Sequence, residues 1–170
     1  KEFIKKNDEF TVNIALIHKN APILGVVYAP ALGDMYEAKK GDGAFKNGQK
    51  LPLEMNKTPK KSLRVVVSKS NYTDETQRFI DSLALNTEHL TLISKGSSLK
   101  LCMVATGEAD IYPRLAPTME WDTAAADAVV RCAGKMTYKF HSKFNIEDST
   151  SGDSLWYNKE NLLNPWFIVK

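Results

Sequence analysis

The chain has 170 residues, of which 43% are hydrophobic, 25% charged and 9% aromatic, with 23 Lys and Arg against 20 Asp and Glu. This composition is typical of a folded globular domain and excludes a disordered chain, a collagen and a coiled coil. The lysines are scattered and the net charge is only +3, which disfavours a dedicated nucleic-acid surface. No nucleic-acid partner is therefore expected, and small anionic substrates stay open.

The cysteines and the absence of targeting patterns bear on the compartment. Cys102 and Cys132 both lie in apolar helical patterns, which favours a reducing environment over a disulfide framework. Nothing in the sequence approaches the roughly 18 apolar residues of a membrane span, and it shows no signal-peptide pattern. These features predict a cytoplasmic protein.

The first 56 residues predict an antiparallel sheet. Phe10–Ile17 alternates with the period of a half-buried strand, and Ile23–Ala29 follows a turn at residues 19–22 to complete a hairpin. Met35–Ala38 predicts a third strand, and the Gly and Asn residues between positions 41 and 48 supply the chemistry of short turns. We expect residues 1–56 to be a sheet portion that completes the N-terminal half of the fold.

Strands and helices alternate after an expected exposed loop over residues 54–62. Strands are predicted at Leu63–Val67, Leu90–Ile93, Asp110–Tyr112 and Trp166–Val169. The β-branched run of the first of these suits a strand that is buried on both faces. Helices are predicted to begin after a cap at Thr73, near Ser97 and near Trp121, the last two ending at Thr106 and at Gly134. Residues 145–154 are polar and predict a loop. The order predicts an α/β half over residues 57–170, with helix starts that could bind phosphate.

Three segments offer chemistry for an anion or a metal. Lys95–Lys100 is a polar turn at a helix start, where N–H groups, two hydroxyls and an ammonium can receive a phosphate, although serines there more often cap the helix. The guanidinium of Arg114 can grip a phosphate in two places, although exposed loop arginines are usually just solvated. Asp122 begins an alanine-rich helix, where an N-cap is commoner than a ligand of a divalent cation. The residues alone leave these alternatives open.

The order of these segments resembles a known family. Gly96–Lys100, Gly107–Arg114 and Pro117–Ala125 are similar to motifs of the 3′(2′),5′-bisphosphate nucleotidase (CysQ) branch of the inositol monophosphatase superfamily. The resemblance covers nearly the whole chain, since further similar segments are Lys1–Lys5, Phe10–Ile17, Gly25–Pro30 and Leu162–Pro165. The Trp-Asp motif marks the superfamily, whereas the Gly-Ser-Ser-Leu-Lys and Tyr-Pro-Arg segments favour the nucleotidase branch. The implied fold is the layered α-β-α-β-α sandwich of the inositol monophosphatases and sugar phosphatases.

The resemblance also implies an activity. The family hydrolyses phosphomonoesters with Mg²⁺, and this branch acts on the 3′-phosphate of adenosine 3′,5′-bisphosphate to release AMP and phosphate. Asp122 becomes a catalytic Mg²⁺ ligand, because hard Mg²⁺ takes carboxylate and phosphate oxygens and activates a water. The implied substrate-binding residues are Gly96, Ser97, Ser98, Lys100, Arg114 and Asp122. The alternatives are an inositol or sugar phosphatase of the same superfamily and a nucleotide-binding module without catalysis.

Two departures from the family pattern matter. Ala126 stands where the family usually has Gly, which adds one methyl group and need not move Asp122. The other metal carboxylates of the family belong to a Glu-Glu element and to an Asp-Pro-Leu-Asp-Gly-Thr motif that runs directly into Lys-Glu-Phe-Ile, and this sequence opens at Lys1 without an initiator Met. We therefore expect a C-terminal portion of the enzyme, inactive alone, whose partner is the N-terminal portion of the same protein. The resemblance also allows a peripheral location on the cytoplasmic face of the inner membrane.

Overall fold

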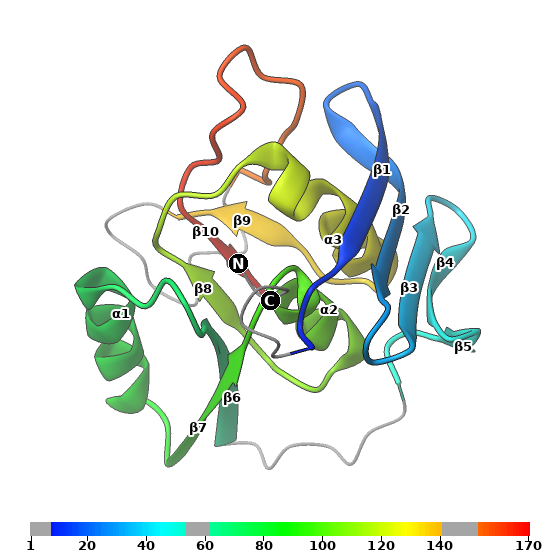
Figure 1. Ribbon diagram of the computed structural model, residues 1–170. Coiled ribbons are helices and arrows are strands. Elements are labelled where there is room, and N and C mark those ends of the chain that lie inside the picture. Colours follow the sequence, from blue (N-terminus) through cyan, green and yellow to red (C-terminus); the bar gives the residue numbers. More distant parts are fainter. Residues whose placement is uncertain (1–7, 54–61, 141–152) are drawn as a thin grey trace.

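The computed structural model describes residues 8–53, 62–140 and 153–170. This part of the chain forms four layers, which are a first sheet, two helices, a second group of strands and an outer helix (Figure 1). The helices of the second layer are α2 (Leu99–Thr106) and α3 (Glu120–Cys132), and the outer helix is α1 (Asp74–Ala84). The mixed α/β class predicted from the sequence is confirmed.

The first sheet is antiparallel, and its five strands follow the order of the sequence. They are β1 (Val12–His18), β2 (Ala21–Ala29), β3 (Asp34–Lys39), β4 (Gly43–Lys46) and β5 (Gln49–Lys50). The turn between β1 and β2 is shorter than predicted, because Lys19 and Asn20 both have positive φ, 47° and 62°, and close the hairpin by themselves. The three predicted strands are confirmed, and β4 and β5 lie where the sequence predicted only turns.

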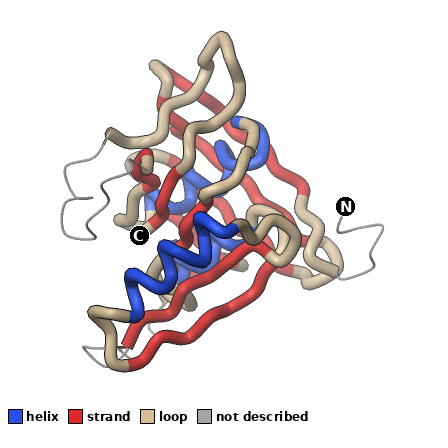
Figure 2. The backbone as a smooth tube through the Cα atoms, turned by 90° about the vertical axis from the view of Figure 1, so that its left-hand side faces the viewer, coloured by secondary structure: helices blue, strands red, loops and turns tan. Residues whose placement is uncertain are grey.

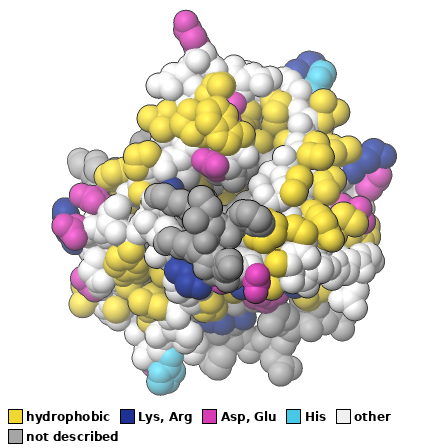
Figure 3. All heavy atoms as spheres, in the orientation of Figure 1, with side chains coloured by type: hydrophobic (Ala, Val, Ile, Leu, Met, Phe, Trp, Pro, Cys, Tyr) yellow, Lys and Arg dark blue, Asp and Glu magenta, His cyan; other side chains and the backbone are white. Residues whose placement is uncertain are grey.

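The half-buried face of β1 carries Asn13, Ala15 and Ile17, and its other face is exposed. Val12, Ile14 and Leu16 are exposed by 53%, 62% and 55%, whereas Ala15 and Ile17 pack against the core under the sheet. Figure 3 shows hydrophobic side chains gathered on the side of the molecule where β1, β2 and β3 lie. The predicted alternation is therefore present, with Val12, Ile14 and Leu16 directed outward.

A close approach of α3 to the first sheet explains this orientation. A Cβ placed on Gly25 of β2 would lie 2.2 Å from the backbone oxygen of Ala125 and 2.7 Å from Cβ of Ala128. Ala15 is the cross-strand partner of Gly25 and lies on the same face of the sheet. Only small side chains fit where Gly25 and its partner Ala15 meet α3, so Val12, Ile14 and Leu16 of β1 occupy the opposite face.

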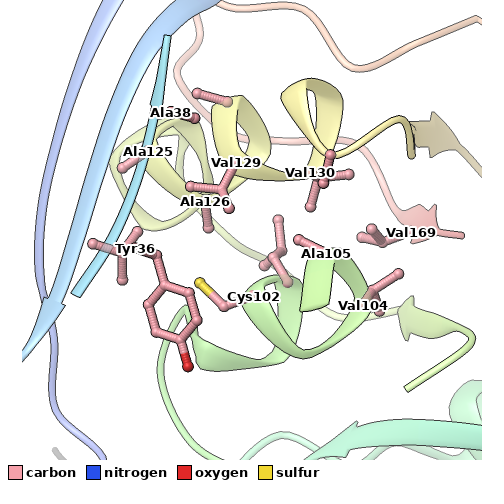
Figure 4. Packing of buried hydrophobic residues seen from close by; sticks show 14 of the residues in the cluster. Tyr36, Ala38, Cys102, Val104, Ala105, Ala125, Ala126, Val129, Val130 and Val169 are labelled. Carbon is pink, nitrogen blue, oxygen red and sulfur yellow. The ribbon is translucent and has the colours of Figure 1, made fainter. Parts of the chain in front are cut away.

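The main hydrophobic core lies between α3, α2 and the two groups of strands. Figure 4 shows Val129 and Val130 on the side of α3 that faces α2, with Tyr36 of β3 and Val169 of the last strand at the sides of the cluster. Both cysteines are free thiols, and burial in this core raises the pKa of the thiol of Cys102. That thiol therefore stays protonated and packs as a small apolar group.

The second group of strands includes a pair that is covered by α1. Figure 2, turned by 90° from Figure 1, shows this helix lying along the pair. These are β6 (Ser62–Ser68) and β7 (His89–Lys95), which are parallel, as a crossover through a helix requires. Val65 forms a parallel bridge with Ile111, next to an antiparallel sheet whose order is β8 (Tyr112–Arg114), β10 (Phe167–Val169) and β9 (Thr137–Lys139). The strand β9 was not predicted.

Local signals in the sequence mark the helix ends correctly. The hydroxyl of Thr73 accepts a hydrogen bond from the N–H of Thr76 at 3.2 Å, so Thr73 caps α1 as predicted. Gly134 follows the end of α3 with a φ of 81°, a conformation that glycine adopts without strain. None of the described helices is long and apolar enough to cross a membrane.

Some predictions are not tested by this structure. The predicted loops at 54–62 and 145–154 lie largely outside the described residues, which exclude 54–61 and 141–152. The division of the chain into 1–56 and 57–170 also stays a prediction. Strands β1 to β4 of the first part pack directly on α3 of the second, so the two parts share one core.

We predict that Gly25→Ala destabilises the protein by about 3 kcal/mol, because the new methyl group must displace the backbone of α3. Equilibrium unfolding in urea measures the change. Gly48→Ala is the control, since φ there is 80° but no atom lies within 4 Å of a new Cβ, and its cost should be about 1 kcal/mol. Equal stability of Gly25→Ala and the parent protein would contradict the close approach.

Candidate active site

A cavity of about 230 Å³ lies where the carboxyl ends of β6 and β7 meet the starts of α2 and α3. Its lining contains every site residue that the sequence predicted, namely Gly96, Ser97, Ser98, Lys100, Arg114 and Asp122. Sequence reasoning missed several polar residues of the same lining, namely Asn13, Ser68, Ser70, Asn71, Thr118 and Thr123. A signal for Ser68–Asn71 was present, because polar residues directly after a buried strand often line a site at the edge of the sheet.

The serine hydroxyls at the start of α2 are tied to the first sheet. The hydroxyl of Ser98 donates to Oδ1 of Asn13 at 2.7 Å and lies 2.9 Å from the hydroxyl of Thr11. The hydroxyls of Ser97 and Thr11 are 2.5 Å apart, and Ser97 has a positive φ of 51°. Ser98 is the N-cap residue of α2, but its side chain makes no capping hydrogen bond. Of the two alternatives, capping by the hydroxyl of Ser98 is therefore not observed, and both serines fix the turn against the start of β1.

Glu9 holds the same turn from the other side. Its carboxylate is 8% exposed and accepts a hydrogen bond from the N–H of Gly96 at 2.8 Å. The ammonium groups of Lys69 and Lys95 lie 3.4 Å and 3.6 Å from Oε1 of Glu9. The N–H of Gly96 is thus used inside the protein, so the expected receptor for phosphate has one backbone donor fewer than the sequence predicted.

Lys100 brings a buried ammonium group to the cavity. Its side chain is 5% exposed, and Nζ donates to the backbone oxygen of Ser97 at 2.6 Å. The same Nζ lies 5.5 Å from the centre of the Tyr112 ring, a favourable distance for a cation above an aromatic face. Burial raises the pKa of the Tyr112 hydroxyl to about 12, so this residue is neutral beside the ammonium group at physiological pH.

Arg114 brings a second buried cation. It lies at the end of β8 and is only 7% exposed, which excludes the alternative of a solvated loop arginine. Its Nε donates to the backbone oxygen of Ala116 at 3.1 Å, and its Nη2 donates to that of Pro117 at 2.7 Å. These two bonds hold the segment that leads from β8 into α3. A guanidinium has five N–H donors, so it can serve this segment and an anion together.

Asp122 lies in the first turn of α3, and its carboxylate has two roles in the geometry. Oδ2 accepts a hydrogen bond from the N–H of Met119 at 2.9 Å. Met119 is the N-cap residue and Asp122 is the third residue of the helix, so the N-cap role considered from the sequence is wrong, although the carboxylate still stabilises the helix start. The residue is also exposed and forms part of the cavity lining. The hydrogen bond uses one of the two carboxylate oxygens, so the other alternative, ligation of a cation, is compatible with it.

Glu120 is the nearest acidic neighbour of Asp122 in the sequence, but its carboxylate serves another purpose. Its oxygens accept hydrogen bonds from the N–H groups of Asn158 and Lys159, at 2.8 Å and 3.1 Å, and pair with the ammonium group of Lys159. Burial raises the pKa of Glu120, but these bonds outweigh it, so the pKa lies below its usual value. Glu120 therefore anchors the C-terminal segment and is not part of the cavity.

The described residues fit one ligand position of a Mg²⁺ site. Asp122 is the one carboxylate in the cavity lining within residues 8–53, 62–140 and 153–170. No cluster of three or more His, Cys, Asp or Glu side chains occurs in the same ranges. Mg²⁺ commonly binds through one or two carboxylates, with phosphate and water oxygens as its other ligands. Asp122 fits this pattern as a single anchor.

Comparison with known sequences agrees with the geometry. Residues 1–164 match the inositol monophosphatase family. The chain is 43% identical over 170 residues to the 3′(2′),5′-bisphosphate nucleotidase CysQ of Salmonella typhimurium, a match that covers 99% of this chain and 63% of the relative. It is 34% identical to the CysQ of Haemophilus influenzae, of which it covers 60%. The chain thus spans less than two thirds of the length of these relatives.

Solved structures give the same result. The crystal structure of CysQ from Bacteroides thetaiotaomicron superimposes with a TM-score of 0.87 at 41% identity, covering 99% of this chain and 65% of that one. The Thermotoga maritima IMPase superimposes with a TM-score of 0.73 at 24% identity, and the match covers 99% of this chain and 59% of the IMPase chain. At this identity the match supports the fold alone. The layered α/β architecture is therefore confirmed. By its sequence match over residues 1–164 and by its fold, the chain belongs to the inositol monophosphatase family.

Proposed function

We propose that the protein is a Mg²⁺-dependent phosphomonoesterase that converts adenosine 3′,5′-bisphosphate to AMP and phosphate. The observation that carries this proposal is the cavity in which the carboxylate of Asp122 meets two buried cations, Lys100 and Arg114. Such a set can hold a divalent metal and a substrate with more than one phosphate at once. The name of the CysQ relatives, 3′(2′),5′-bisphosphate nucleotidase, supports the same substrate class.

Asp122 is the residue of this chain that would hold Mg²⁺. When bound, the metal would polarise a phosphoryl oxygen and lower the pKa of a water that attacks phosphorus. The hydrogen bond from the N–H of Met119 keeps the carboxylate in place before the metal arrives. The positive end of the α3 dipole lies at the same turn and favours both the carboxylate and a nearby phosphate.

Lys100 and Arg114 would bind the phosphates of the substrate. Both side chains are almost fully buried and are held by backbone oxygens, so little side-chain entropy is lost when an anion binds. A cation that is already partly desolvated interacts more strongly with a phosphate than one at the open surface. Ser97 and Ser98 contribute chiefly by holding the turn that carries Lys100 into the cavity.

An inositol or sugar phosphatase and a non-catalytic nucleotide-binding module are the competing functions. Two cations beside one carboxylate favour a substrate with two phosphates over inositol 1-phosphate, which has one. The test measures phosphate release from both compounds by the full-length gene product with Mg²⁺. Faster release from inositol 1-phosphate would support the first competitor, and binding of the nucleotide without release from either compound would support the second.

Residues 1–170 alone are expected to release no phosphate from adenosine 3′,5′-bisphosphate at any Mg²⁺ concentration. The reason is that Asp122 is the one carboxylate that the described residues place at the cavity. One carboxylate can anchor a single Mg²⁺ ion, but it cannot hold a cluster of two or three metal ions. A colorimetric phosphate assay measures this, with the full-length gene product as the positive control. Turnover by the 170 residues alone would show that the ligand set is sufficient.

We predict that Asp122→Asn lowers the turnover number of the full-length gene product at least about 100-fold, because an amide is a poor ligand for Mg²⁺. The amide oxygen can still accept the N–H of Met119, so the melting temperature should change little. Steady-state kinetics and thermal unfolding are measured on the same samples. Normal turnover in this variant would exclude Asp122 as the metal ligand.

Lys100→Met is expected to raise KM for adenosine 3′,5′-bisphosphate about 10- to 100-fold, because it removes a charge-assisted hydrogen bond worth roughly 1.5–3 kcal/mol and keeps the apolar stem. The turnover number should fall much less. Lys50→Met, at an exposed lysine of β5, is the matched control and should leave both parameters unchanged. An unchanged KM in Lys100→Met would remove Lys100 from the substrate site.

A further inference from the structure

The side-chain amide of Asn164 bridges the residues on both sides of Asp122. Its Nδ2 donates to the backbone oxygen of Met119 at 2.9 Å, to the hydroxyl of Thr123 at 3.0 Å and, less closely, to the hydroxyl of Thr118 at 3.3 Å. The backbone N–H of Asn164 donates to the backbone oxygen of Thr118 at 2.8 Å. One side chain from the C-terminal segment thus clamps the start of α3.

Asn164 and Asp122 both bind the backbone of Met119. The N–H of Met119 donates to Oδ2 of Asp122 at 2.9 Å, and the N–H of Asp122 donates to the backbone oxygen of Met119 at 3.0 Å. That same oxygen accepts the amide of Asn164. The orientation of the Met119 backbone therefore connects Asn164 to the carboxylate, although Asn164 does not line the cavity.

The other contacts of the C-terminal segment do not replace this bridge. The N–H of Glu120 donates to the backbone oxygen of Leu162 at 2.9 Å, and Met119 forms an isolated β-bridge with Leu163. These two contacts place the segments side by side through the backbone alone. Side chains of the segment also reach α3, since Lys159 pairs with the carboxylate of Glu120 and the hydroxyl of Tyr157 donates to that of Thr123 at 3.4 Å, but neither of these contacts includes Met119. Asn164 supplies the cross-link from residue 119 to residue 123.

The burial of Asn164 indicates that its hydrogen-bond donors, and not its packing, explain why an amide occupies this position. The residue is 4% exposed, and Oδ1 has no hydrogen-bond partner among the described residues. A buried acceptor without a partner is unfavourable, so an apolar side chain of similar size would cost less here if the position served packing alone. An apolar side chain could not donate to the backbone oxygen of Met119.

We infer that Asn164 is a positioning residue for Asp122 and fixes the direction in which its carboxylate meets the metal. This inference rests on the proposed function, in which Asp122 is a Mg²⁺ ligand. Ligand orientation affects metal affinity, because residues that hold a ligand in place typically change affinity 10- to 100-fold when they are removed.

The first test needs no catalysis and uses residues 1–170 with amide hydrogen exchange as the readout. Asn164→Ala should speed exchange at the amides of Met119 and Asp122 at least about 10-fold, because both of their hydrogen bonds lose their support. Asn161→Ala is the matched control. Asn161 is exposed on the same segment, and its Oδ1 accepts only the N–H of Leu163 in the contacts described, so both amides should exchange at the parent rate. Unchanged exchange in Asn164→Ala would overturn the inference.

The second test separates positioning from general stability in the full-length gene product. Asn164→Ala should raise the Mg²⁺ concentration for half-maximal activity at least about 10-fold, whereas KM for the nucleotide at saturating Mg²⁺ should stay near the parent value. In Asn164→Ser the hydroxyl can make one of the hydrogen bonds, so its Mg²⁺ concentration for half-maximal activity should lie between those of the parent protein and Asn164→Ala. This variant replaces Asn164→Ala in the test if Asn164→Ala does not fold. Val129→Ala, in the core of α3, controls for lost stability and should leave the Mg²⁺ requirement unchanged.

The outcomes distinguish this inference from the proposed function. A parent-like Mg²⁺ requirement in the Asn164 variants, together with lost turnover in Asp122→Asn, would overturn the positioning role alone. Normal turnover in Asp122→Asn would overturn the ligand role of Asp122 and the positioning role with it. A raised Mg²⁺ requirement in the Asn164 variants, with lost turnover in Asp122→Asn, supports both.

Discussion

The close approach of α3 to the first sheet is the constraint on which the rest of the structure depends. Gly25 leaves no space for a side chain against the backbone of Ala125, and the buried alanines of α3 keep the helix at that distance along its length. Because α3 also packs on α2, the same helix fixes the position of the first sheet relative to the cavity. Asp122 lies in the first turn of α3, so its position depends on how the rest of the helix packs.

Polar contacts behind the cavity hold its lining in place. Glu9, Thr11 and Asn13 bind the turn before α2, while Arg114 binds the segment before α3. Hydrogen bonds of this kind are strong in a buried, low-dielectric environment and leave their donors with one orientation. The cavity is therefore preorganised, so that an arriving anion meets cations that need little rearrangement.

The same close packing has a consequence on the opposite face of the first sheet. The cross-strand pairs of β1 and β2 on that face are Val12 with Tyr28, Ile14 with Val26, and Leu16 with Leu24. Val12, Ile14 and Leu16 of β1 are more than half exposed. Figure 3 shows hydrophobic side chains gathered on this side of the molecule. A contiguous apolar face of this kind is typical of an interaction surface.

The sequence by itself determined the features that depend on neighbouring residues. Alternation over Phe10–Ile17, the cap at Thr73 and the glycine after α3 are local patterns, and each of them predicted its element correctly. The order of three short motifs was also enough to name the residues that meet in the cavity, although their individual roles stay proposals.

Only the tertiary structure decided which partner each of these residues meets. Periodicity shows that β1 has two faces, but it does not show that the face with Ala15 must lie against α3. That requirement comes from the contact between Gly25 and Ala125, which are a hundred positions apart. Ser98 binds Thr11, 87 positions away, instead of capping its own helix, and Arg114 is buried by elements that no local window contains. Contacts between distant segments follow from packing in three dimensions, which local patterns in the chain do not encode.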